Sequence, residues 1–222
     1  MDSLRERLER VRGDIADAAT SVGRSADELT LIVVTKFHPA SLVRDLAALG
    51  VTDVGENRHP EAGDKAAECA DLAVRWHFIG QLQTNKAKFV RQYAHAVHSV
   101  DRPALATALS GDRQLDCFVQ VNLTDDPNRG GVNDADLEPL IEHVLNTDGL
   151  TLRGLMAVAP LDEPARPAFA HVRALSERIQ RIAPDATALS MGMSHDFADA
   201  IAEGATHLRI GTAITGNRPP AG

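Results

Sequence analysis

Leu31-Ile32-Val33-Val34-Thr35-Lys36 is an apolar run that ends in a lysine, with the helix-breaking Pro39 shortly after it. Short runs that are apolar on both faces are typical of strands in a parallel sheet that helices cover on both sides. Lys36 then stands at the end of a buried strand, where its ammonium group must be solvated, paired with an anion or used chemically. The run therefore predicts an α/β fold with an amine at the end of its first strand.

Similar apolar runs alternate with helical patterns along the rest of the chain. Strands are expected at 29–35, 53–56, 76–80, 96–100, 117–122, 154–158, 188–191 and 207–211. Helices are expected at 3–22, 41–49, 60–69, 84–93, 102–109, 136–145, 165–182 and 196–202. Eight strand–helix units in 222 residues predict a single (β/α)8 TIM barrel with an additional N-terminal helix, residues 1–222 forming one domain that ends in a frayed tail at 217–222. A doubly wound open sheet is the alternative, but the first strand is not followed by the GxGxxG dinucleotide fingerprint.

Composition and charge argue against several classes of protein. The net charge of −8, from 23 basic and 31 acidic residues, disfavours a broad basic surface for nucleic acid. Cys69 and Cys117 lie far apart and outside any CxxC pair, as expected for two reduced thiols. No histidine pair has metal-ligand spacing backed by further ligands, so no metal is expected. The charged N-terminus has no apolar signal core, and no run is long enough to span a bilayer, so we expect a cytoplasmic protein without membrane contact.

Polar residues and glycines gather where the predicted strands end, which is the end of a TIM barrel that carries function. Lysine is the one common side chain that condenses with an aldehyde to form an imine. Lys36 is therefore the candidate catalytic residue, although an isolated lysine at a barrel rim is more often only solvated. Two loops after the last two strands favour the chemical interpretation.

These two loops have the composition of phosphate sites. The loop that begins with Ser190 and ends with Ser194 is built from small residues, so that backbone N–H groups can approach an anion while the hydroxyls add donors. Gly211 and Thr212 repeat the arrangement after the eighth strand, and barrels often bind phosphate between these loops. Ser194 could also simply cap the following helix. An aldehyde held by Lys36 and a phosphate held by these loops together predict pyridoxal phosphate as the cofactor.

Three further side chains could contact the cofactor ring. Arg209 lies on the same side of its strand as Gly211, and an arginine inside a barrel needs an acceptor, for which the ring nitrogen is suitable. An outward-facing Arg209 over the helices is the alternative. Asn57 and His77 lie at or near strand ends and could orient the ring or its phenolic oxygen. His77, between Trp76 and Phe78, could equally be a hydrogen-bonded core residue.

These residues belong to longer motifs that make the chain similar to one known family. The motifs are Val34-Thr35-Lys36, Gly55-Glu56-Asn57-Arg58, the stretch 76–86, the stretch 190–196 and Arg209-Ile210-Gly211-Thr212-Ala213-Ile214. In this order and over nearly the whole chain, they closely resemble the YggS/PROSC family of pyridoxal phosphate homeostasis proteins.

The resemblance implies a barrel like the N-terminal domain of bacterial alanine racemase, with pyridoxal phosphate bound as an internal aldimine on Lys36. It places the phosphate on Ser194, Gly211 and Thr212 and sets Arg209 at the ring nitrogen. It also implies a monomer with a role in intracellular vitamin B6 balance and no generally established enzymatic activity. Two positions depart from the family pattern: Arg129 replaces a usual lysine, which questions a transfer role there, and Thr215 replaces a usual aromatic residue.

Three functions are compatible with these residues. The first is a protein that binds pyridoxal phosphate and buffers or delivers it, with apo-enzymes as possible recipients and little catalysis, because a donor-only arginine leaves the ring nitrogen unprotonated and the electron sink weak. The second is an amino-acid racemase, but relatives recruit a tyrosine from a second domain, and the only tyrosine here, Tyr93, falls on a predicted outer helix. The third is an aldolase without cofactor, in which Lys36 attacks a sugar phosphate.

Overall fold

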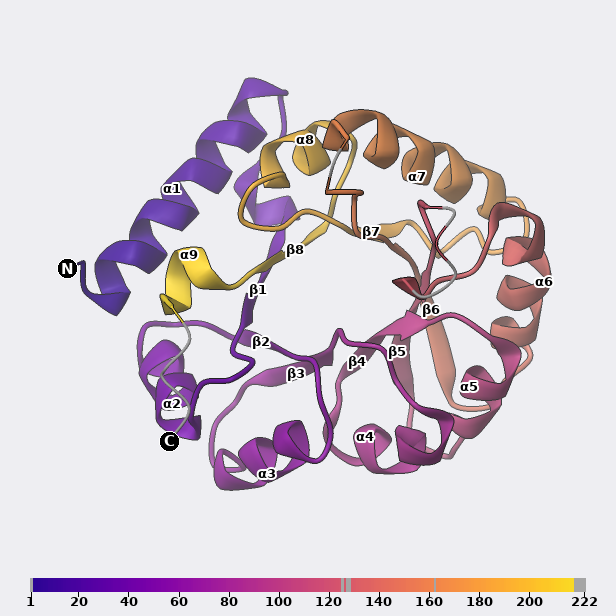
Figure 1. Cartoon of the computed structure of the whole chain (residues 1–222), viewed down its shortest axis with the longest axis horizontal. Coiled ribbons are helices and arrows are strands. Elements are labelled where there is room, and N and C mark those ends of the chain that lie inside the picture. The colour runs from indigo at the N-terminus through magenta and orange to yellow at the C-terminus, as the bar shows by residue number, and fades with distance from the viewer. Residues whose placement is uncertain (1, 125, 127–128, 162, 218–222) are drawn as a thin grey trace.

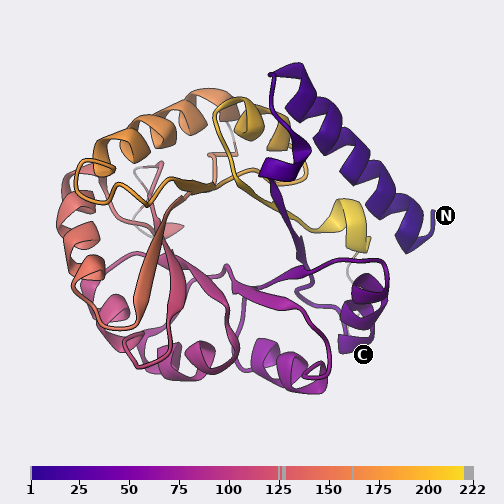
Figure 2. The same cartoon turned by 180° about the vertical axis from the view of Figure 1, so that it is seen from behind.

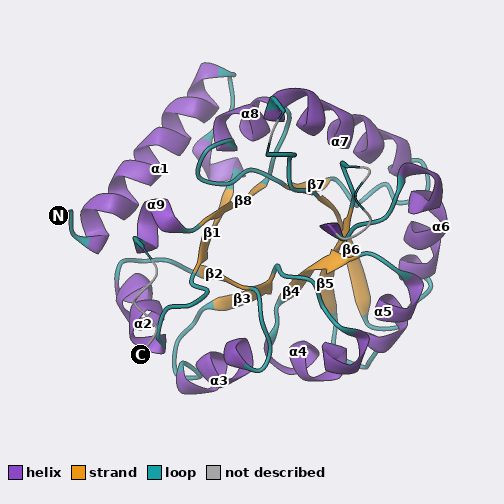
Figure 3. Cartoon of the chain, in the orientation of Figure 1, coloured by secondary structure: helices purple, strands orange, loops and turns teal. Residues whose placement is uncertain are grey.

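The structure, a computed structural model, describes residues 2–124, 126, 129–161 and 163–217. Its centre is a closed barrel of eight parallel strands in sequence order, with β1 paired to β8 (Figures 1 and 3). The predicted (β/α)8 barrel is therefore confirmed. The strands are β1 Thr30–Val34, β2 Asp53–Glu56, β3 Arg75–Phe78, β4 Ala96–Val100, β5 Leu115–Gln120, β6 Leu150–Met156, β7 Ala188–Ser190 and β8 His207–Ile210.

Helices surround the strands on all sides, as the view from behind also shows (Figure 2). They are α1 Leu4–Ser21, α2 Ala40–Ala48, α3 Glu61–Glu68, α4 Ala87–Tyr93, α5 Pro103–Ala108, α6 Asp134–Leu145, α7 Ala165–Ile179, α8 Phe197–Ala202 and α9 Thr212–Thr215, with the short 3₁₀ helices η1 Ala26–Glu28 and η2 Thr84–Lys86. The sequence did not predict η1 or α9, because elements of three or four residues are too short to show a helical period. The tail predicted to fray lies, from residue 218 onward, outside the described residues.

The additional helix α1 begins at a capping box, in which Ser3 and Glu6 each bind the other's backbone N–H. Its apolar face, with Leu8, Val11 and Ile15 buried, packs on the outside of the barrel beside α8 and α9 (Figure 1). Arg7 donates from Nε to the carbonyl oxygen of Ile214, at 2.7 Å. This helix therefore supports the last loop of the barrel, which is one of the two predicted phosphate loops.

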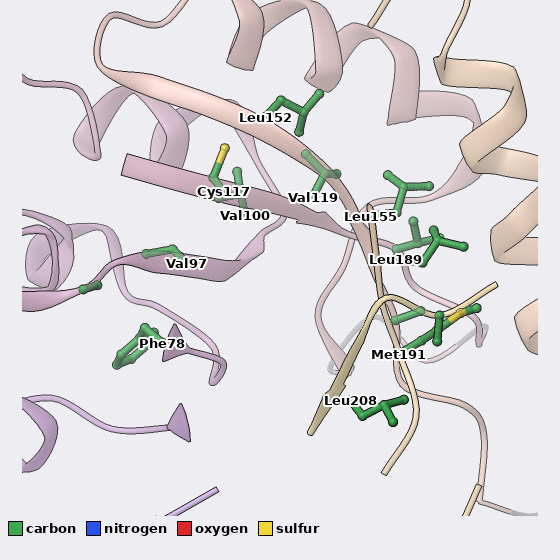
Figure 4. Close-up of a cluster of buried hydrophobic side chains, with 14 of the residues drawn as sticks. Phe78, Val97, Val100, Cys117, Val119, Leu152, Leu155, Leu189, Met191 and Leu208 are labelled. Carbon is green, nitrogen blue, oxygen red and sulfur yellow. The ribbon is translucent and has the colours of Figure 1, made fainter. Parts of the chain in front are cut away.

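The core has two parts because successive side chains of a strand point to opposite faces. One large aliphatic cluster lies between the strands and the helices, and Figure 4 shows a portion of it, including Val97, Val119, Leu155 and Leu208. The inside of the barrel holds a small apolar cluster of Ala96, Phe118 and Met156. Buried polar side chains fill much of the remaining interior: Asp53, His77, His98, Ser190 and Arg209. These buried polar groups must find their hydrogen-bond partners within the barrel.

Candidate functional site

The carboxyl ends of β7, β8 and β1 lie side by side and bring together segments that are far apart in sequence. The backbone N–H of Arg209 donates to the carbonyl oxygen of Gly192 at 3.0 Å, which joins the last strand to the loop after β7. On the other side of β8, a methyl group placed on Gly211 would lie 3.6 Å from Cβ of Val34. Only Thr35 separates Val34 from Lys36 in the sequence. The predicted amine and both predicted phosphate loops therefore meet at one end of the barrel.

Lys36 lies in an exposed turn directly after β1. Its Nζ is 5.9 Å from the centroid of the Phe37 ring, and the guanidinium carbon of Arg58 is 5.3 Å from the same centroid. Phe37 has a φ of 68°, a left-handed conformation that costs about 1–3 kcal/mol for a residue other than glycine. A strained turn of this kind persists only when the surrounding structure holds it in place.

A buried ion pair beneath Lys36 provides that support, and the sequence analysis did not identify it. Lys65 on α3 places Nζ 2.5 Å from Oε1 of Glu56, and the two side chains are only 5% and 2% exposed. The same Nζ donates to the carbonyl oxygen of Thr35 at 3.0 Å, and the Thr35 hydroxyl donates to Oε1 of Glu56 at 2.7 Å. The residue just before Lys36 is thus fixed to both β2 and α3. No pattern of residues in the sequence marks this pair, because α3 reaches β1 only in the folded barrel.

The two predicted phosphate loops present unused backbone donors. The N–H groups of Ser194, His195, Thr212 and Ala213 form no hydrogen bond with any residue that the structure describes. Gly192, with a φ of 96°, turns the first loop, and a side chain there would meet Cβ of Ala200 at 2.7 Å. Free N–H groups at two neighbouring chain turns fit a phosphate group, which accepts hydrogen bonds on three oxygens.

Ser190 does not belong to this group of donors, contrary to the prediction. Its side chain is completely buried inside the barrel, and its Oγ accepts from Nη1 of Arg209 at 2.8 Å and lies 2.8 Å from Nδ1 of His98. The reason is the alternation of the strand: as the last residue of β7, Ser190 points inward rather than along the loop. Ser194, in the loop itself and half-buried, keeps the predicted position.

Arg209 lies inside the barrel, so the alternative of an outward-facing arginine is wrong. Besides Ser190, it contacts the carbonyl oxygen of Ala157, to which Nη2 donates at 2.8 Å. Ala157 directly follows β6, so the guanidinium group lies at the level of the strands' carboxyl ends. Burial lowers the pKa of Arg209 to about 10, with the nearby Asp196 carboxylate acting in the opposite direction. The side chain therefore stays a cation at neutral pH and can only donate hydrogen bonds.

His77 and Asn57 have different positions from each other. His77 lies deep in the barrel with both ring nitrogens engaged, Nε2 with Asp53 at 2.8 Å and Nδ1 with His98 at 2.9 Å. It matches the core-residue alternative and has no free nitrogen for a cofactor ring. Asn57 lies at the mouth, beside a cavity of 530 Å³ that Arg58 also lines, and its Oδ1 has no partner among the described residues.

The remaining positions singled out in the sequence are peripheral. Arg129 is exposed in the loop after β5, and Thr215 is buried on α9. Tyr93, at the end of α4, lines an outer groove beside α3 rather than the mouth, as predicted. Across the described parts of the chain, no three His, Cys, Asp or Glu side chains form a group that could hold a metal ion. No helix among the same residues is long and apolar enough to cross a membrane.

Comparison with known proteins identifies the family. The profile of the alanine racemase N-terminal domain matches residues 9–219. The chain is 41% identical to the pyridoxal phosphate homeostasis protein of Pseudomonas aeruginosa over 98% of its own length and 97% of that protein. It is 38% identical to the protein of the same description from Escherichia coli, with 98% of each chain covered. The chain belongs to the pyridoxal phosphate homeostasis protein family.

Solved structures of relatives agree with this assignment. PipY of Synechococcus elongatus with pyridoxal phosphate bound is 36% identical and superposes with a TM-score of 0.84, covering 96% of this chain and 100% of PipY. Alanine racemase from Corynebacterium glutamicum shares the fold with a TM-score of 0.68 at 15% identity, and this chain spans 62% of it. At this low identity, the second likeness establishes the fold alone. The described residues of this chain thus correspond to the barrel of the racemase.

Proposed function

We propose that this protein binds pyridoxal 5′-phosphate on Lys36 and buffers or delivers it in intracellular vitamin B6 homeostasis, with little or no catalysis. The observation that carries the proposal is the meeting of Lys36 with the two donor-rich loops at the ends of β1, β7 and β8. The membership of a family whose relatives are named for pyridoxal phosphate homeostasis supports it.

Each part of the cofactor has a matching group in the chain. The N–H groups of Ser194, His195, Thr212 and Ala213 would hold the phosphate, since they supply a local site for a dianion in a chain with a net charge of −8. The Lys36 amine would hold the aldehyde carbon through a C=N bond, with the aldehyde oxygen leaving as water. When bound, pyridoxal phosphate supplies an electron sink for carbanion chemistry at amino acids.

The chain's own groups hold this chemistry back. Arg209 would donate to the ring nitrogen and keeps its own proton at neutral pH, so the nitrogen would stay unprotonated and the sink weak. A two-base racemase needs a second acid or base opposite the lysine, and Tyr93, the one tyrosine of the sequence, lies on the outside of the barrel. Holding the cofactor without using it is the property required of a carrier, which would act as a monomer that gives pyridoxal phosphate to apo-enzymes.

The substitution Lys36→Ala tests the covalent link. Purified protein is expected to show imine absorbance that borohydride traps on Lys36, and the variant is expected to lose both while keeping weak, non-covalent binding through the phosphate contacts. Lys88→Ala is a matched control, because Lys88 is also exposed and lies over the ring of the next residue, 5.1 Å from the Phe89 centroid. The proposal fails if wild-type protein shows no imine absorbance and borohydride traps no cofactor. Exchange of the α-hydrogen of amino acids at ordinary enzymatic rates would favour the racemase instead.

A further inference from the structure

A continuous line of hydrogen bonds crosses the inside of the barrel. It starts at Asp53, the first residue of β2, and passes through His77 on β3 and His98 on β4 to Ser190, the last residue of β7, and then to Arg209. The four successive distances are 2.8 Å, 2.9 Å, 2.8 Å and 2.8 Å. All five side chains are buried. The line therefore connects the amino end of the barrel with the guanidinium group at the mouth.

The two ends of this line determine the direction of every bond between them. The Asp53 carboxylate can only accept a hydrogen bond, and the Arg209 guanidinium can only donate one. A neutral imidazole donates from one nitrogen and accepts at the other, and a hydroxyl can do both. With His77 and His98 neutral, one arrangement of protons satisfies all four bonds. Arg209 donates to Ser190, Ser190 to Nδ1 of His98, Nε2 of His98 to Nδ1 of His77, and Nε2 of His77 to Asp53.

The surroundings of His98 and Asp53 favour the protonation states assigned to these two groups. Burial, reinforced by the neighbouring His77, His207, Arg209 and His95, holds the pKa of His98 well below its usual value, so its imidazole is neutral. Burial would raise the pKa of Asp53, but its hydrogen bonds from His77, Arg75 and Thr52 outweigh burial and lower that pKa well below the usual range. Asp53 is thus a carboxylate, which accepts the hydrogen bond from Nε2 of His77.

We infer that Asp53, His77 and His98 are positioning residues, which act through Ser190 to hold Arg209 in a fixed orientation toward the cofactor ring. The Ser190 hydroxyl presents a lone pair to Arg209 because its own proton is committed to His98, and that commitment depends on His77 and Asp53 in turn. A serine without this line behind it could turn its proton toward other acceptors and release the guanidinium group. The identity of the ring rests on the proposed function, whereas the line itself exists without cofactor.

Nuclear magnetic resonance of the nitrogen-15-labelled full chain tests the line without cofactor. In wild-type protein, both His77 and His98 are expected to carry their proton on Nε2, and the Arg209 guanidinium N–H groups are expected to be protected from exchange with water. A proton on Nδ1 of His98 would overturn the proposed direction. This measurement needs no variant, so it stands even if a core substitution prevents folding.

Two matched pairs of variants test the coupling. His77→Phe is expected to remove the constraint on which nitrogen of His98 carries the proton, and to expose the Arg209 N–H groups to exchange. His95→Phe is expected to do neither. The His95 ring contacts His77 edge-on, with a centroid separation of 5.8 Å, but it lies outside the line. Ser190→Ala is expected to weaken pyridoxal phosphate binding about tenfold, as for the loss of one hydrogen bond to a charged group. Ser99→Ala removes a buried hydroxyl that has no hydrogen-bond partner in the part of the chain that the structure describes, and it is expected to leave binding unchanged.

The outcomes separate the two proposals. One outcome is that His77 and His98 both carry their proton on Nε2 and that His77→Phe exposes the Arg209 N–H groups to exchange, but no cofactor binds. In that case the line of hydrogen bonds stands and the cofactor proposal fails. If the cofactor binds equally well to Ser190→Ala and Ser99→Ala, or if His77→Phe affects Arg209 no more than His95→Phe does, the positioning role is refuted.

Discussion

Replacing Lys65 by methionine is the most demanding test of how this barrel holds the turn that carries Lys36. The substitution keeps most of the side-chain volume but removes the ammonium group that contacts Glu56 at 2.5 Å and the Thr35 carbonyl at 3.0 Å. Glu56, only 2% exposed, is left as a buried carboxylate whose remaining side-chain hydrogen bond to the described residues comes from the Thr35 hydroxyl. Removing one partner of a buried ion pair costs about 3–5 kcal/mol.

Urea unfolding followed by circular dichroism measures this loss. We expect Lys65→Met to reduce the free energy of unfolding by about 3–5 kcal/mol, and the double variant with Glu56→Gln to recover a part of it, because the uncompensated charge is gone. Lys88→Met, on an exposed lysine, should change stability by less than about 0.5 kcal/mol. Lys65→Met should also bind pyridoxal phosphate more weakly, because Lys65 holds Thr35, which directly precedes Lys36. A loss below about 1 kcal/mol, or strict additivity in the double variant, would refute the reasoning.

Three further predictions concern the loops and the interior. Gly192→Ala should destabilise the loop after β7 and weaken binding of inorganic phosphate in competition assays, because the φ of 96° is strained for alanine and its methyl would meet Ala200 at 2.7 Å; unchanged phosphate binding would contradict the loop assignment. Burial lowers the pKa of His207 to about 4, so the unfolded chain binds more protons between about pH 6.5 and 4. Stability should therefore be fully present above about pH 6.5 and fall with decreasing pH by up to about 1.4 kcal/mol per pH unit from this group, and His207→Phe should reduce that slope in denaturation measured across the range. Arg209→Glu should strengthen the electron sink and raise α-hydrogen exchange of amino acids, seen as deuterium incorporation; unchanged exchange in a folded variant would contradict the role given to the arginine.

The architecture could be predicted from the sequence because it depends on local patterns. Each strand of the barrel is a short run with apolar residues on the face that the helices cover, and β2 and β4 have the bounds that the sequence predicts. The meeting of Lys36 with Gly211 and Thr212 also follows from topology, since parallel strands place all their carboxyl ends at one rim. The binding roles of these residues remain predictions.

The depth of a side chain inside the barrel could not be predicted in this way. Alternation along a strand tells which face a residue occupies, but its height depends on the stagger between strands, which is set only when the barrel closes. For this reason Ser190 and His77, expected at the cofactor, lie in the interior line that also contains His98. The ion pair of Lys65 could not be predicted from the sequence either, because Lys65 meets its partner Glu56 only once α3 has packed on the sheet.

The order of residues by itself determined a barrel of parallel strands with an amine after the first and small-residue turns after the last two. Only the tertiary structure decided which buried groups hold one another: the ion pair beneath Lys36 and the polar line from Asp53 to Arg209. The physical reason is that buried polar groups must find partners across the closed barrel, and those partners come from strands and helices that no local pattern relates.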